Sequence, residues 1–493
     1  MTLAVHPRIG KHQLKIGLTQ CRIKAWIDAR TVMNPSLALR NVFLQGNDFE
    51  RRVIEQTADV IHMPVNPTLA IHGTQTCDVE GFTIVQPAFD LHGVTIRPDM
   101  LNKGQARLSE IKSGTRVKDE YILDVAIGAA AARASGLTIE TMELIHLNPD
   151  HRHGGDEPLS TAIDVTGEVA AILQNIDFEA EIGTLRSETM PPIEPKKACR
   201  TCDLNTFCYD DPSSLVVNIP RISQNKIDDM LGNGIETIDQ LLIEEEHLEN
   251  LTPKQRTYVA GFANAVDYTT VAIDVGAIYV YGPWALEDEH LHLDVETSST
   301  AVPRLPGQKP WQQTLTQFSI THDDGETMTE SHYLVNSACS DLEDLAVALI
   351  EAANVAPNAP IVVYNASFER ARLMELADAY PSHRDELLAI VDRLVDLFPL
   401  VKRAVRGLQS YSLKAVAPLL EPSFSYDGLA INNGGMANAV MTLLRLEGGA
   451  EIIEQHTGMG IQEARTALLA YCANDTLGTA VILRALKSSL ESQ

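Results

Sequence analysis

Apolar residues recur at two different periods along the chain, and each period predicts its own kind of element. In residues 37–61 (LALRNVFLQGNDFERRVIEQTADVI) they return every three to four positions, which predicts an amphipathic helix. Residues 93–101 and 106–114 instead alternate apolar and polar positions, as half-buried strands do. An Ala-rich stretch, 121–134, predicts a long helix, and MELIHLN (142–148) predicts another strand.

The second half of the chain repeats this alternation in a different order. Three strands are expected at LHLDVET, TLTQFSITH and SHYLVN, followed by a helix at 341–353 and a short strand at 361–364. The remainder is mainly helical and ends in a long helix over 461–486. Three strands, a helix, a strand and then helices is the order of an RNase H-like α/β domain.

A small helical insert separates the two halves. KIDDMLGNGIETIDQLL (226–242) predicts a helix, a tight turn through Gly232 and Gly234, and a second helix that opens near Thr237. The segment resembles a helix-hairpin-helix, whose turn can offer backbone N–H groups to a phosphate. A plain pair of linker helices fits the pattern equally well. We therefore expect an α/β protein of three parts: 1–212, 213–272 and 273–493.

Composition narrows the setting of the protein. The chain has no low-complexity tract and no apolar run long enough to span a bilayer, and its start lacks the apolar core of a signal peptide, so we expect a cytoplasmic protein without a membrane partner. The net charge of −27 argues against a protein that coats nucleic acid non-specifically. Residues 1–60 nevertheless hold nine Lys and Arg against five Asp and Glu, which suits either a solvated surface or one that faces phosphate.

One candidate site lies on the two strands of the first half. Asp99 ends the strand at 93–101, and Glu110 and Lys112 share one face of the next strand because they are two residues apart. Two carboxylates there can hold Mg²⁺ or Mn²⁺ against a phosphodiester, while Lys112 orients or deprotonates the attacking water. Glu50, on the preceding helix, can add a third carboxylate.

These residues resemble the motifs of the RecB-family branch of PD-(D/E)xK nucleases, over most of residues 1–210. Gly46–Glu50 matches the first motif, with Glu50 where a histidine is common; Arg97-Pro98-Asp99 matches the second and Glu110-Ile111-Lys112 the third. The resemblance implies a restriction-endonuclease-like fold and DNA hydrolysis. The family often carries Gln and Tyr on the following helix, and both contact DNA. This chain has Gly128 and Ala132 there, so the resemblance does not imply these DNA contacts.

Four of the seven cysteines form a second constellation in the first half. Cys199, Cys202 and Cys208 are clustered, and Cys21 lies alone near the N-terminus; together they can close a four-ligand site. The pattern resembles the iron-binding cysteines of AddB and of CRISPR-associated RecB-like exonucleases, which implies a [4Fe–4S] cluster. A structural zinc ion is the alternative. The other three cysteines, Cys77, Cys339 and Cys472, are expected to be buried residues without a ligand role.

The second half carries its own set of carboxylates. Asp294 and Glu296 face one side of the first strand, Glu369 follows a strand-to-helix passage, and Tyr471 and Asp475 lie one turn apart on the last helix. Four carboxylates gathered by an RNase H-like fold would hold two divalent ions, and Tyr471 would position the attacking water. Asp396 is expected to support the site without binding metal.

This set resembles the tyrosine-bearing form of the DEDD exonuclease superfamily. Residues 290–445 resemble more closely an uncharacterised C-terminal domain that is often joined to RecB-like nucleases. The second motif usually ends in Asp, whereas this chain has Glu369, whose carboxylate lies about one bond length further out. The resemblance implies a 3′→5′ exonuclease.

Together these patterns predict a metal-dependent nuclease with two sites, acting on single-stranded DNA or duplex ends in repair, recombination or defence. An RNA-processing 3′→5′ exonuclease is one alternative, because nothing in the sequence reads a 2′-hydroxyl. A nucleic-acid-binding assembly factor with residual sites is the other. The sequence does not identify protein partners, which stay unknown.

Overall fold

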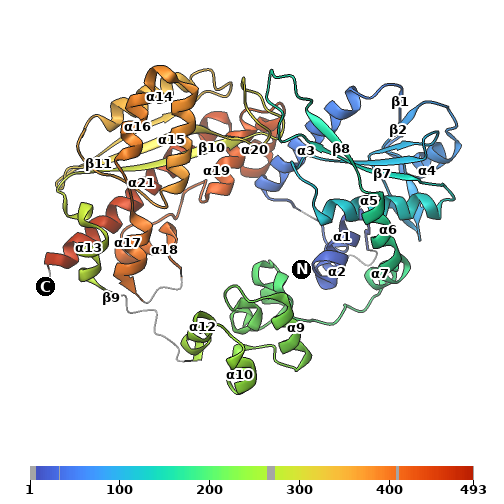
Figure 1. Ribbon diagram of the computed structural model, residues 1–493, viewed down its shortest axis with the longest axis horizontal. Coiled ribbons are helices and arrows are strands. Elements are labelled where there is room, and N and C mark those ends of the chain that lie inside the picture. Colours follow the sequence, from blue (N-terminus) through green and yellow to red (C-terminus); the bar gives the residue numbers. More distant parts are fainter. Residues whose placement is uncertain (1–6, 33, 264–271, 407–409, 492–493) are drawn as a thin grey trace. The chain divides into compact units, whose positions relative to one another are not determined.

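The computed structural model describes residues 7–32, 34–263, 272–406 and 410–491 (Figure 1). The chain forms a mixed α/β protein with two mixed sheets and many helices. It divides into two compact units, the first comprising Met1–Asn34 and Gly46–Val266 and the second Pro35–Gln45 and Asp267–Gln493. The division falls inside helix α3 (Leu37–Glu55). The expected domain boundary between residues 272 and 273 lies directly after residues 264–271, which are outside the described part of the chain.

The first unit is built on a six-stranded sheet of order β1-β2-β5-β6-β7-β8. β1 pairs with β2 and β6 with β7 in parallel, and the other neighbours are antiparallel. Its strands are β1 (Val60–His62), β2 (Thr83–Val85), β5 (Met100–Asn102), β6 (Arg107–Lys112), β7 (Thr141–Leu147) and β8 (Ser160–Asp164). The strands expected at 106–114 and 142–148 are confirmed as β6 and β7. The single strand expected at 93–101 is wrong: β4 (Val94–Ile96) forms a separate hairpin with β3 (Phe89–Leu91), and Asp99 lies between β4 and β5, directly before β5.

Helix α5 (Asp119–Ala134) forms the centre of this unit, because most of its Ala-rich length is buried against β6, β7 and the β3–β4 hairpin. A Cβ atom added at Gly128 would lie 3.0 Å from Pro98 Cγ and 3.3 Å from a methyl carbon of Leu108. Small residues therefore let α5 approach the sheet closely. The other helices here are α1 (Lys11–Thr19), α2 (Arg22–Asp28), α4 (Pro67–Thr76), α6 (Thr166–Asn175), α7 (Phe178–Arg186), η1 (Lys197–Thr201) and α8 (Asn205–Cys208).

The two helices and the tight turn predicted at residues 226–242 are confirmed, and they pack in a small apolar cluster of their own. Helix α9 (Gln224–Gly232) ends at a turn in which Gly234 has φ +75°, a conformation that favours glycine. Helix α10 (Ile238–Leu242) then opens with Thr237 as N-cap, in a capping box with Gln240. The neighbouring helices are η2 (Pro212–Ser214), η3 (Val216–Asn218), α11 (Glu245–Glu249) and α12 (Pro253–Ala263).

The second unit is built on a five-stranded sheet of order β12-β11-β10-β13-β14. The first three strands are antiparallel, and β13 and β14 continue the sheet in parallel with β10. Its strands are β10 (His290–Ser299), β11 (Gln313–Asp323), β12 (Met328–Leu334), β13 (Ile361–Val363) and β14 (Leu394–Asp396). The chain is mainly helical after residue 364, as expected, and β14 is a short strand that was not predicted.

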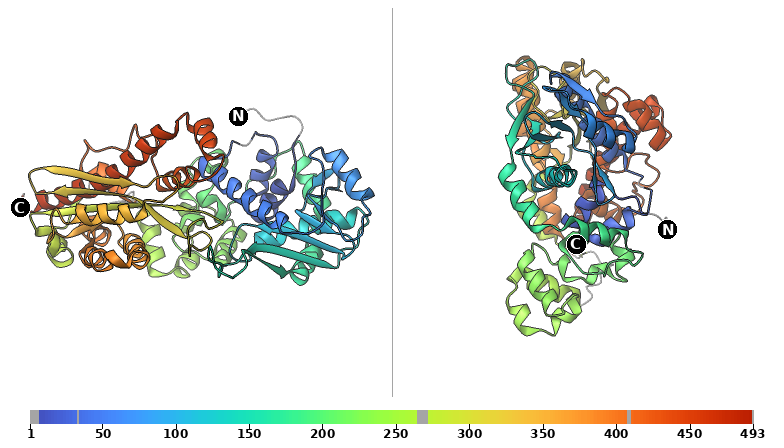
Figure 2. Two further views of the ribbon diagram at one scale, coloured as in Figure 1. Left: turned by 90° about the horizontal axis from the view of Figure 1, so that it is seen from above. Right: turned by 90° about the vertical axis from the view of Figure 1, so that its right-hand side faces the viewer.

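Helices cover both faces of this sheet, as Figure 2 (left) shows for α21 in red and the orange helices opposite. Odd-numbered residues of β10 (Leu291, Leu293, Val295) enter the apolar core with α14 (Leu342–Ala353), α15 (Ser367–Ala379) and α16 (Arg384–Asp392). The remaining elements are β9 (Ala272–Ile273), α13 (Val275–Tyr281), η4 (Pro283–Leu286), η5 (Pro381–His383), α17 (Leu397–Ala404), β15 (Val405–Arg406), α18 (Leu413–Leu420), α19 (Gly434–Leu443) and α20 (Gly449–Thr457).

Helix α21 (Ile461–Glu491) packs along the opposite face through polar contacts. The side chain of Gln317 donates to the Leu468 carbonyl at 2.8 Å, and the hydroxyls of Thr321 and Thr476 are 2.8 Å apart. By length and composition alone this helix could cross a membrane, contrary to our expectation that the chain has no such run. More than half of its most apolar stretch is buried, so the same composition is that of a core helix.

Candidate functional site

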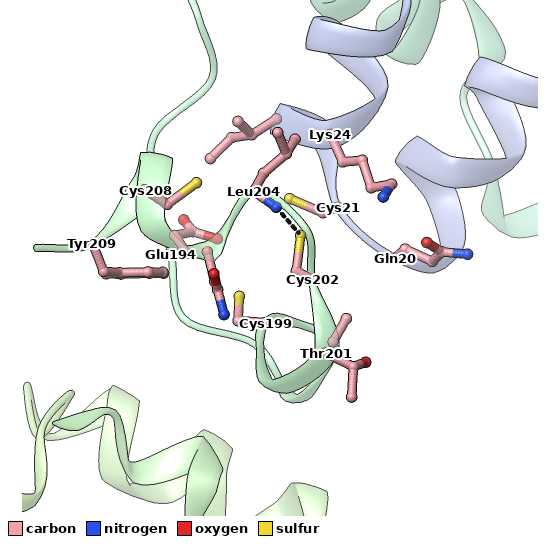
Figure 3. A pocket seen from close by; sticks show the side chains of 13 residues that line it. Gln20, Cys21, Lys24, Glu194, Cys199, Thr201, Cys202, Leu204, Cys208 and Tyr209 are labelled. Atoms are coloured by element: carbon pink, nitrogen blue, oxygen red, sulfur yellow. Dashed lines mark hydrogen bonds between the residues drawn. The ribbon is translucent and has the colours of Figure 1, made fainter. Parts of the chain in front are cut away.

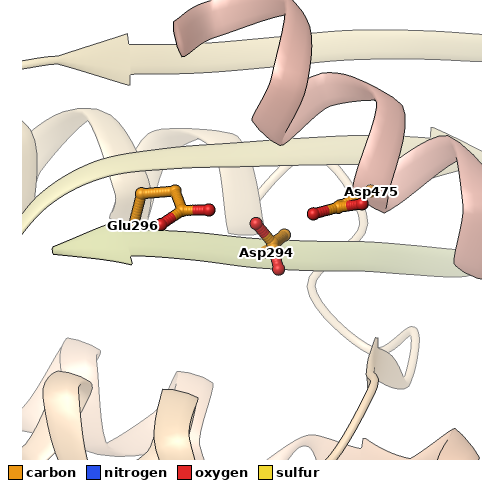
Figure 4. Close-up of side chains that lie close together, drawn as sticks. All are labelled: Asp294, Glu296 and Asp475. Atoms are coloured by element: carbon orange, nitrogen blue, oxygen red, sulfur yellow. The ribbon is translucent and has the colours of Figure 1, made fainter. Parts of the chain in front are cut away.

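Three carboxylates of the second unit meet between strand β10 and helix α21 (Figure 4). Alternation along β10 directs Asp294 and Glu296 to the α21 face, and one ligating oxygen from each lies within 4.8 Å of the others and of Asp475. Among the residues that the structure describes, no other three His, Cys, Asp or Glu side chains meet this closely. The pairing with β11 is irregular directly after Glu296, so a β-bulge lies beside the site.

The environment of these carboxylates opposes their ionisation. Burial, together with the charges of Asp475 and Glu296, raises the pKa of Asp294 well above its usual range. Burial and the charge of Asp475 raise the pKa of Glu296 to about 8. The Oδ1 atom of Asp475 is buried without a hydrogen-bond partner. Three crowded acids with an open ligand atom are suited to a divalent cation, which would replace the missing positive charge.

Helix α21 also brings Tyr471 to the site, one turn before Asp475. Lys414, at the start of α18, donates to the Tyr471 hydroxyl oxygen at 2.9 Å, and its ammonium lies 4.4 Å from the centre of the Tyr471 ring. It also lies 5.1 Å from the ring centre of Tyr426. Because Lys414 occupies one acceptor position of the Tyr471 oxygen, the phenolic proton remains available to a third group.

Cys472 was expected to be a buried cysteine without a role in the site. It is fully buried, but its thiol contacts Asp294, with Sγ 3.3 Å from Oδ2. Burial and the neighbouring Asp294 raise the pKa of Cys472, so the thiol stays protonated. It donates a hydrogen bond to the carboxylate of Asp294. Cys472 therefore orients Asp294 and is not a ligand in its own right.

Glu369 lies apart from this group of three. It is buried on the first turn of α15, its Oε2 atom has no hydrogen-bond partner, and burial raises its pKa to about 7. Asp396 holds the entry to that helix: its carboxylate accepts from the backbone N–H groups of Asn365 and Ala366 at 3.0 and 3.1 Å. It also caps α17 through Phe398. These contacts are those of a supporting residue.

The first unit gathers Glu50, Asp99 and Gln86 at the end of strand β2. The Gln86 amide donates to Glu50 Oε1 at 2.6 Å and to Asp99 Oδ1 at 3.3 Å, so it joins the two carboxylates. Gln86 has φ +52°, a strained conformation for a residue other than glycine. The Ile111 N–H donates to Asp99 Oδ2 at 2.6 Å, which anchors Asp99 to strand β6.

Glu110 and Lys112 extend this site along β6. Lys112 donates to Glu110 Oε1 at 2.7 Å, Lys11 donates to the same oxygen, and Glu110 Oε2 is buried without a partner. Burial opposes the charge on Glu110, but the two ammonium groups outweigh it and lower its pKa. Burial and the charge of Glu110 raise the pKa of Asp99. Glu110 thus keeps one unpartnered oxygen, Oε2, and Asp99 keeps one weakly held oxygen, Oδ1.

Helix α5 presents Asp124 to this site. Asp124 Oδ2 lies 3.2 Å from Lys112 and 3.0 Å from Lys15. The neighbouring carboxylates outweigh burial and raise the pKa of Lys112, so this lysine is held as an ammonium ion. Gly128, at the position where the resembled motif has glutamine, faces Pro98 and Leu108 so closely that a side chain there would require them to shift.

The four cysteines line one cavity of about 280 Å³ (Figure 3). Backbone N–H groups of Lys196 and Leu204 each lie 3.4 Å from a sulfur, those of Cys199 and Cys202 respectively. Burial and the nearby cysteines raise the pKa of Cys208 to about 11, so the thiolate forms only with a cationic ligand.

The spacing of these sulfurs bears on which ligand fits. Tetrahedral zinc with Zn–S bonds of about 2.3 Å would hold sulfurs roughly 3.8 Å apart. No three of the four sulfurs, all in described residues, lie within 4.8 Å of one another. A cubane cluster spreads its thiolates more widely because each binds a different iron, so this arrangement suits the cluster better than zinc.

Comparison with known proteins finds similarity over part of this chain. A family model described as a domain of unknown function, DUF2779, matches residues 291–421. That match includes Asp294, Glu296, Glu369 and Lys414 and ends before Tyr471 and Asp475. It agrees with the expected likeness to an uncharacterised C-terminal domain, and it names no nuclease family.

Two curated bacterial proteins are also similar to the chain. The uncharacterized protein MG366 homolog of Mycoplasma pneumoniae is 28% identical over 232 residues, which cover 42% of this chain and 33% of that protein. The uncharacterized protein UU173 of Ureaplasma parvum is 26% identical over 174 residues, covering 30% of this chain and 25% of that protein. The chain thus matches a third or less of their lengths. No solved structure matches it.

Several residues in these sites were missed from the sequence. Most lie on other elements than the carboxylate motifs: Lys11, Lys15, Gln86, Asp124, Lys414 and Tyr426. Cys472 is next to Tyr471 on α21, but its contact with Asp294 was not expected. A weak signal existed for two of them, because Lys11 and Lys15 are four residues apart in a basic N-terminal stretch. The others carry no local signal, since only the fold brings them to the carboxylates.

The raised pKa values predict how stability depends on pH without divalent ions. Glu296 has an ordinary pKa near 4.5 when unfolded and about 8 when folded, so the folded protein binds the extra proton between those values. Stability should therefore fall as pH rises from about 4.5 through 8. A shift of one pKa unit corresponds to about 1.4 kcal/mol of stability and, in a domain of this size, to roughly 3–6 °C in melting temperature.

Melting curves of metal-free protein at pH 6 and pH 8 measure this effect. Glu296→Gln should melt higher than the parent at pH 8 and vary less with pH, and Mg²⁺ should raise the melting temperature of the parent more than that of the variant. Asp324→Asn, at an exposed turn, is the matched control. Equal pH profiles for parent and Glu296→Gln would contradict the assignment.

Proposed function

We propose that this protein is a metal-dependent nuclease with two hydrolytic sites, one in each unit, acting on DNA. The observation that carries the proposal is the group of Asp294, Glu296 and Asp475, three buried carboxylates with ligating oxygens within 4.8 Å. Such a group is costly unless a divalent cation neutralises it. Carboxylate-bound Mg²⁺ or Mn²⁺ is the usual means of activating water against a phosphodiester.

The fold of the second unit supports a 3′→5′ exonuclease of the DEDD type. The sheet order β12-β11-β10-β13-β14, with three antiparallel strands followed by two parallel ones, is that expected of an RNase H-like domain. Asp294 and Glu296 lie on its central strand, as metal-binding carboxylates of such a domain should. When bound, the ions would activate water and stabilise the leaving oxygen.

Protein groups around these carboxylates have distinct tasks in this proposal. Cys472 holds Asp294, and Lys414 fixes the Tyr471 oxygen so that the phenolic proton can be donated to water or phosphate. Glu369 lies outside the group of three and supplies a fourth oxygen for a second ion. Its buried, unpartnered Oε2 atom supports that task.

We propose a PD-(D/E)xK site of the RecB type for the first unit. Asp99 and Glu110 would hold the ion through Asp99 Oδ1, which only the Gln86 amide contacts, and the unpartnered Glu110 Oε2, with Glu50 joined to Asp99 through Gln86. Because the pKa of Lys112 is raised, Lys112 acts as an ammonium that orients water and does not take its proton.

We propose that Cys21, Cys199, Cys202 and Cys208 hold a [4Fe–4S] cluster. The shared cavity, the N–H groups that point to two sulfurs and the wide sulfur spacing support this cluster over zinc. The cluster would close a loop from Cys21 to Cys208 and so tie α2 to the segment after α7.

The cluster proposal predicts a coloured protein. Purified without air, it should be brown and contain about four irons per chain, as a cubane requires. Cys202→Ser should lose iron and lower the melting temperature of the first unit, while Cys77→Ser, which does not line the cavity, should keep both. Stoichiometric zinc without iron in such a preparation would contradict the proposal.

The first site predicts metal-dependent DNA cleavage that depends on Lys112. In a background with Asp294→Asn, Lys112→Ala should remain folded but cut duplex DNA at least 100-fold more slowly, because a water-orienting ammonium is lost. End-labelled DNA and circular dichroism provide the two measurements. Lys118→Ala, an exposed lysine six residues further along, should cut like the background. Unchanged cleavage by both Lys112→Ala and Glu110→Gln would refute this site.

The second site predicts dependence on a free 3′ end. In a Lys112→Ala background, single-stranded DNA should be degraded one nucleotide at a time to nucleoside 5′-monophosphates. Asp294→Ala should abolish this activity because it removes a metal-facing carboxylate, and Tyr471→Phe should weaken it less. Glu369→Asp should retain activity, and Asp324→Ala is the control.

A DNA substrate blocked at its 3′ end should resist this degradation, and an RNA of the same sequence tests the substrate class. If the blocked DNA is degraded as fast as the free one, or if Asp294→Ala changes nothing, the second unit is a binding module. Preferential degradation of RNA would make the site an RNA-processing one.

A further inference from the structure

Helix α1 delivers a lysine to the first carboxylate site that the motifs of that site do not include. Lys11 donates to Glu110 Oε1, and its side chain is only 21% exposed beside a carboxylate that is 2% exposed. The apolar residues Leu14 and Ile16 anchor the same helix in the core of the unit. Lys11 is therefore placed by the fold and is not a solvated surface lysine that happens to touch an acid.

Glu110 receives two ammonium groups on one oxygen and none on the other. Lys112 and Lys11 both donate to Oε1, while Oε2 is buried without a partner. Asp99 is divided in the same way, since Oδ2 accepts from the Ile111 N–H at 2.6 Å and Oδ1 receives only the Gln86 amide at 3.3 Å. Glu110 Oε2, which has no partner, and Asp99 Oδ1, which has only the longer contact with Gln86, provide for one divalent ion, while the two ammonium groups on Glu110 Oε1 oppose a second ion there.

The net charge of the site also favours one divalent ion. Four carboxylates (Glu50, Asp99, Glu110, Asp124) face three ammonium groups (Lys11, Lys15, Lys112), which gives a formal charge of −1 when all are ionised. One divalent ion changes this to +1, which matches the single negative charge of a phosphodiester. Two would give +3, more than the substrate can balance.

We propose that Lys11 takes the place of a second metal ion in the first site. It holds Glu110 so that Oε2 is left for one divalent ion, and its own ammonium stays beside the scissile phosphate as the second positive charge. This rests on the proposed nuclease function of the site and adds to it the number of ions and a positioning residue from helix α1.

Calorimetric titration with Mn²⁺ and single-turnover cleavage of duplex DNA test the proposal together. Both use the full chain with Asp294→Asn and Asp475→Asn, which disable the second site. This background protein should bind one Mn²⁺ ion, and Glu110→Gln should abolish that binding. Adding Lys11→Met should leave one Mn²⁺ bound at least as tightly, since a nearby positive charge is removed, yet slow cleavage at least 100-fold.

Two further variants separate a charge effect from a loss of folding. Lys11→Arg retains the charge and should recover at least tenfold of the lost rate, whereas a purely structural defect would not be rescued in this way. Arg22→Met removes an ion pair with Glu181 outside the site and should cut like the background. Should Lys11→Met fail to fold, Lys11→Gln replaces it, because glutamine keeps a donor for Glu110 without the charge.

Two results would overturn the proposal while leaving the nuclease function intact: cleavage by Lys11→Met as fast as by Arg22→Met, or two Mn²⁺ ions bound to the first site of the background protein. If the background protein neither binds Mn²⁺ nor cuts DNA, the proposed function of the first unit fails, and the assignment of Lys11 fails with it. The behaviour of the background protein alone therefore distinguishes the two failures.

Discussion

Buried carboxylates that lie side by side are the constraint on which both units depend. Two like charges a few ångströms apart in a medium of low polarity repel strongly, and loss of hydration adds to the cost of each. The two units meet this constraint by different means. In the first, lysines from separate elements bind the acids directly; in the second, Lys414 is the nearby ammonium among the described residues and it contacts Tyr471, not a carboxylate. Raised pKa values of Asp294 and Glu296 are the consequence.

The secondary structure around each site follows from this difference. Strand β10 sends Leu291, Leu293 and Val295 into an apolar core and its alternate residues toward α21, so one strand serves both packing and chemistry. Helix α21 meets that second face with the Thr476 hydroxyl and the Leu468 carbonyl, which are partners for the polar side chains of Thr321 and Gln317 on β11. In the first unit α5 instead packs through glycine and alanine, and only Asp124 reaches the site.

Periodic helices and strands were predictable from the sequence, while the side chains that contact and orient the site residues were not. Alternation gave β6 and β10, and helical periodicity gave α5 and α21, because burial of one face leaves a repeating pattern in the chain itself. Strand β14 was missed because Leu394–Asp396 is too short to show a period. The approach of Asp294, Glu296 and Asp475 could be anticipated from motif order, but the contacts of Lys414 and Cys472 arise from tertiary packing and leave no local pattern.

The two departures from the motifs that the chain resembles lie in different surroundings. A Cβ atom at Gly128 would lie 3.0 Å from Pro98 Cγ, so a side chain there requires Pro98 to shift by a few tenths of an ångström, and glycine suits the close packing of α5. Glu369 lies on the first turn of α15, and Asp396 fixes the start of that helix through the backbone N–H groups of Asn365 and Ala366. A glutamate places its carboxylate about one bond length further from this fixed backbone than an aspartate would. Because Glu369 Oε2 is buried without a partner, this oxygen remains able to bind an ion under the proposed function.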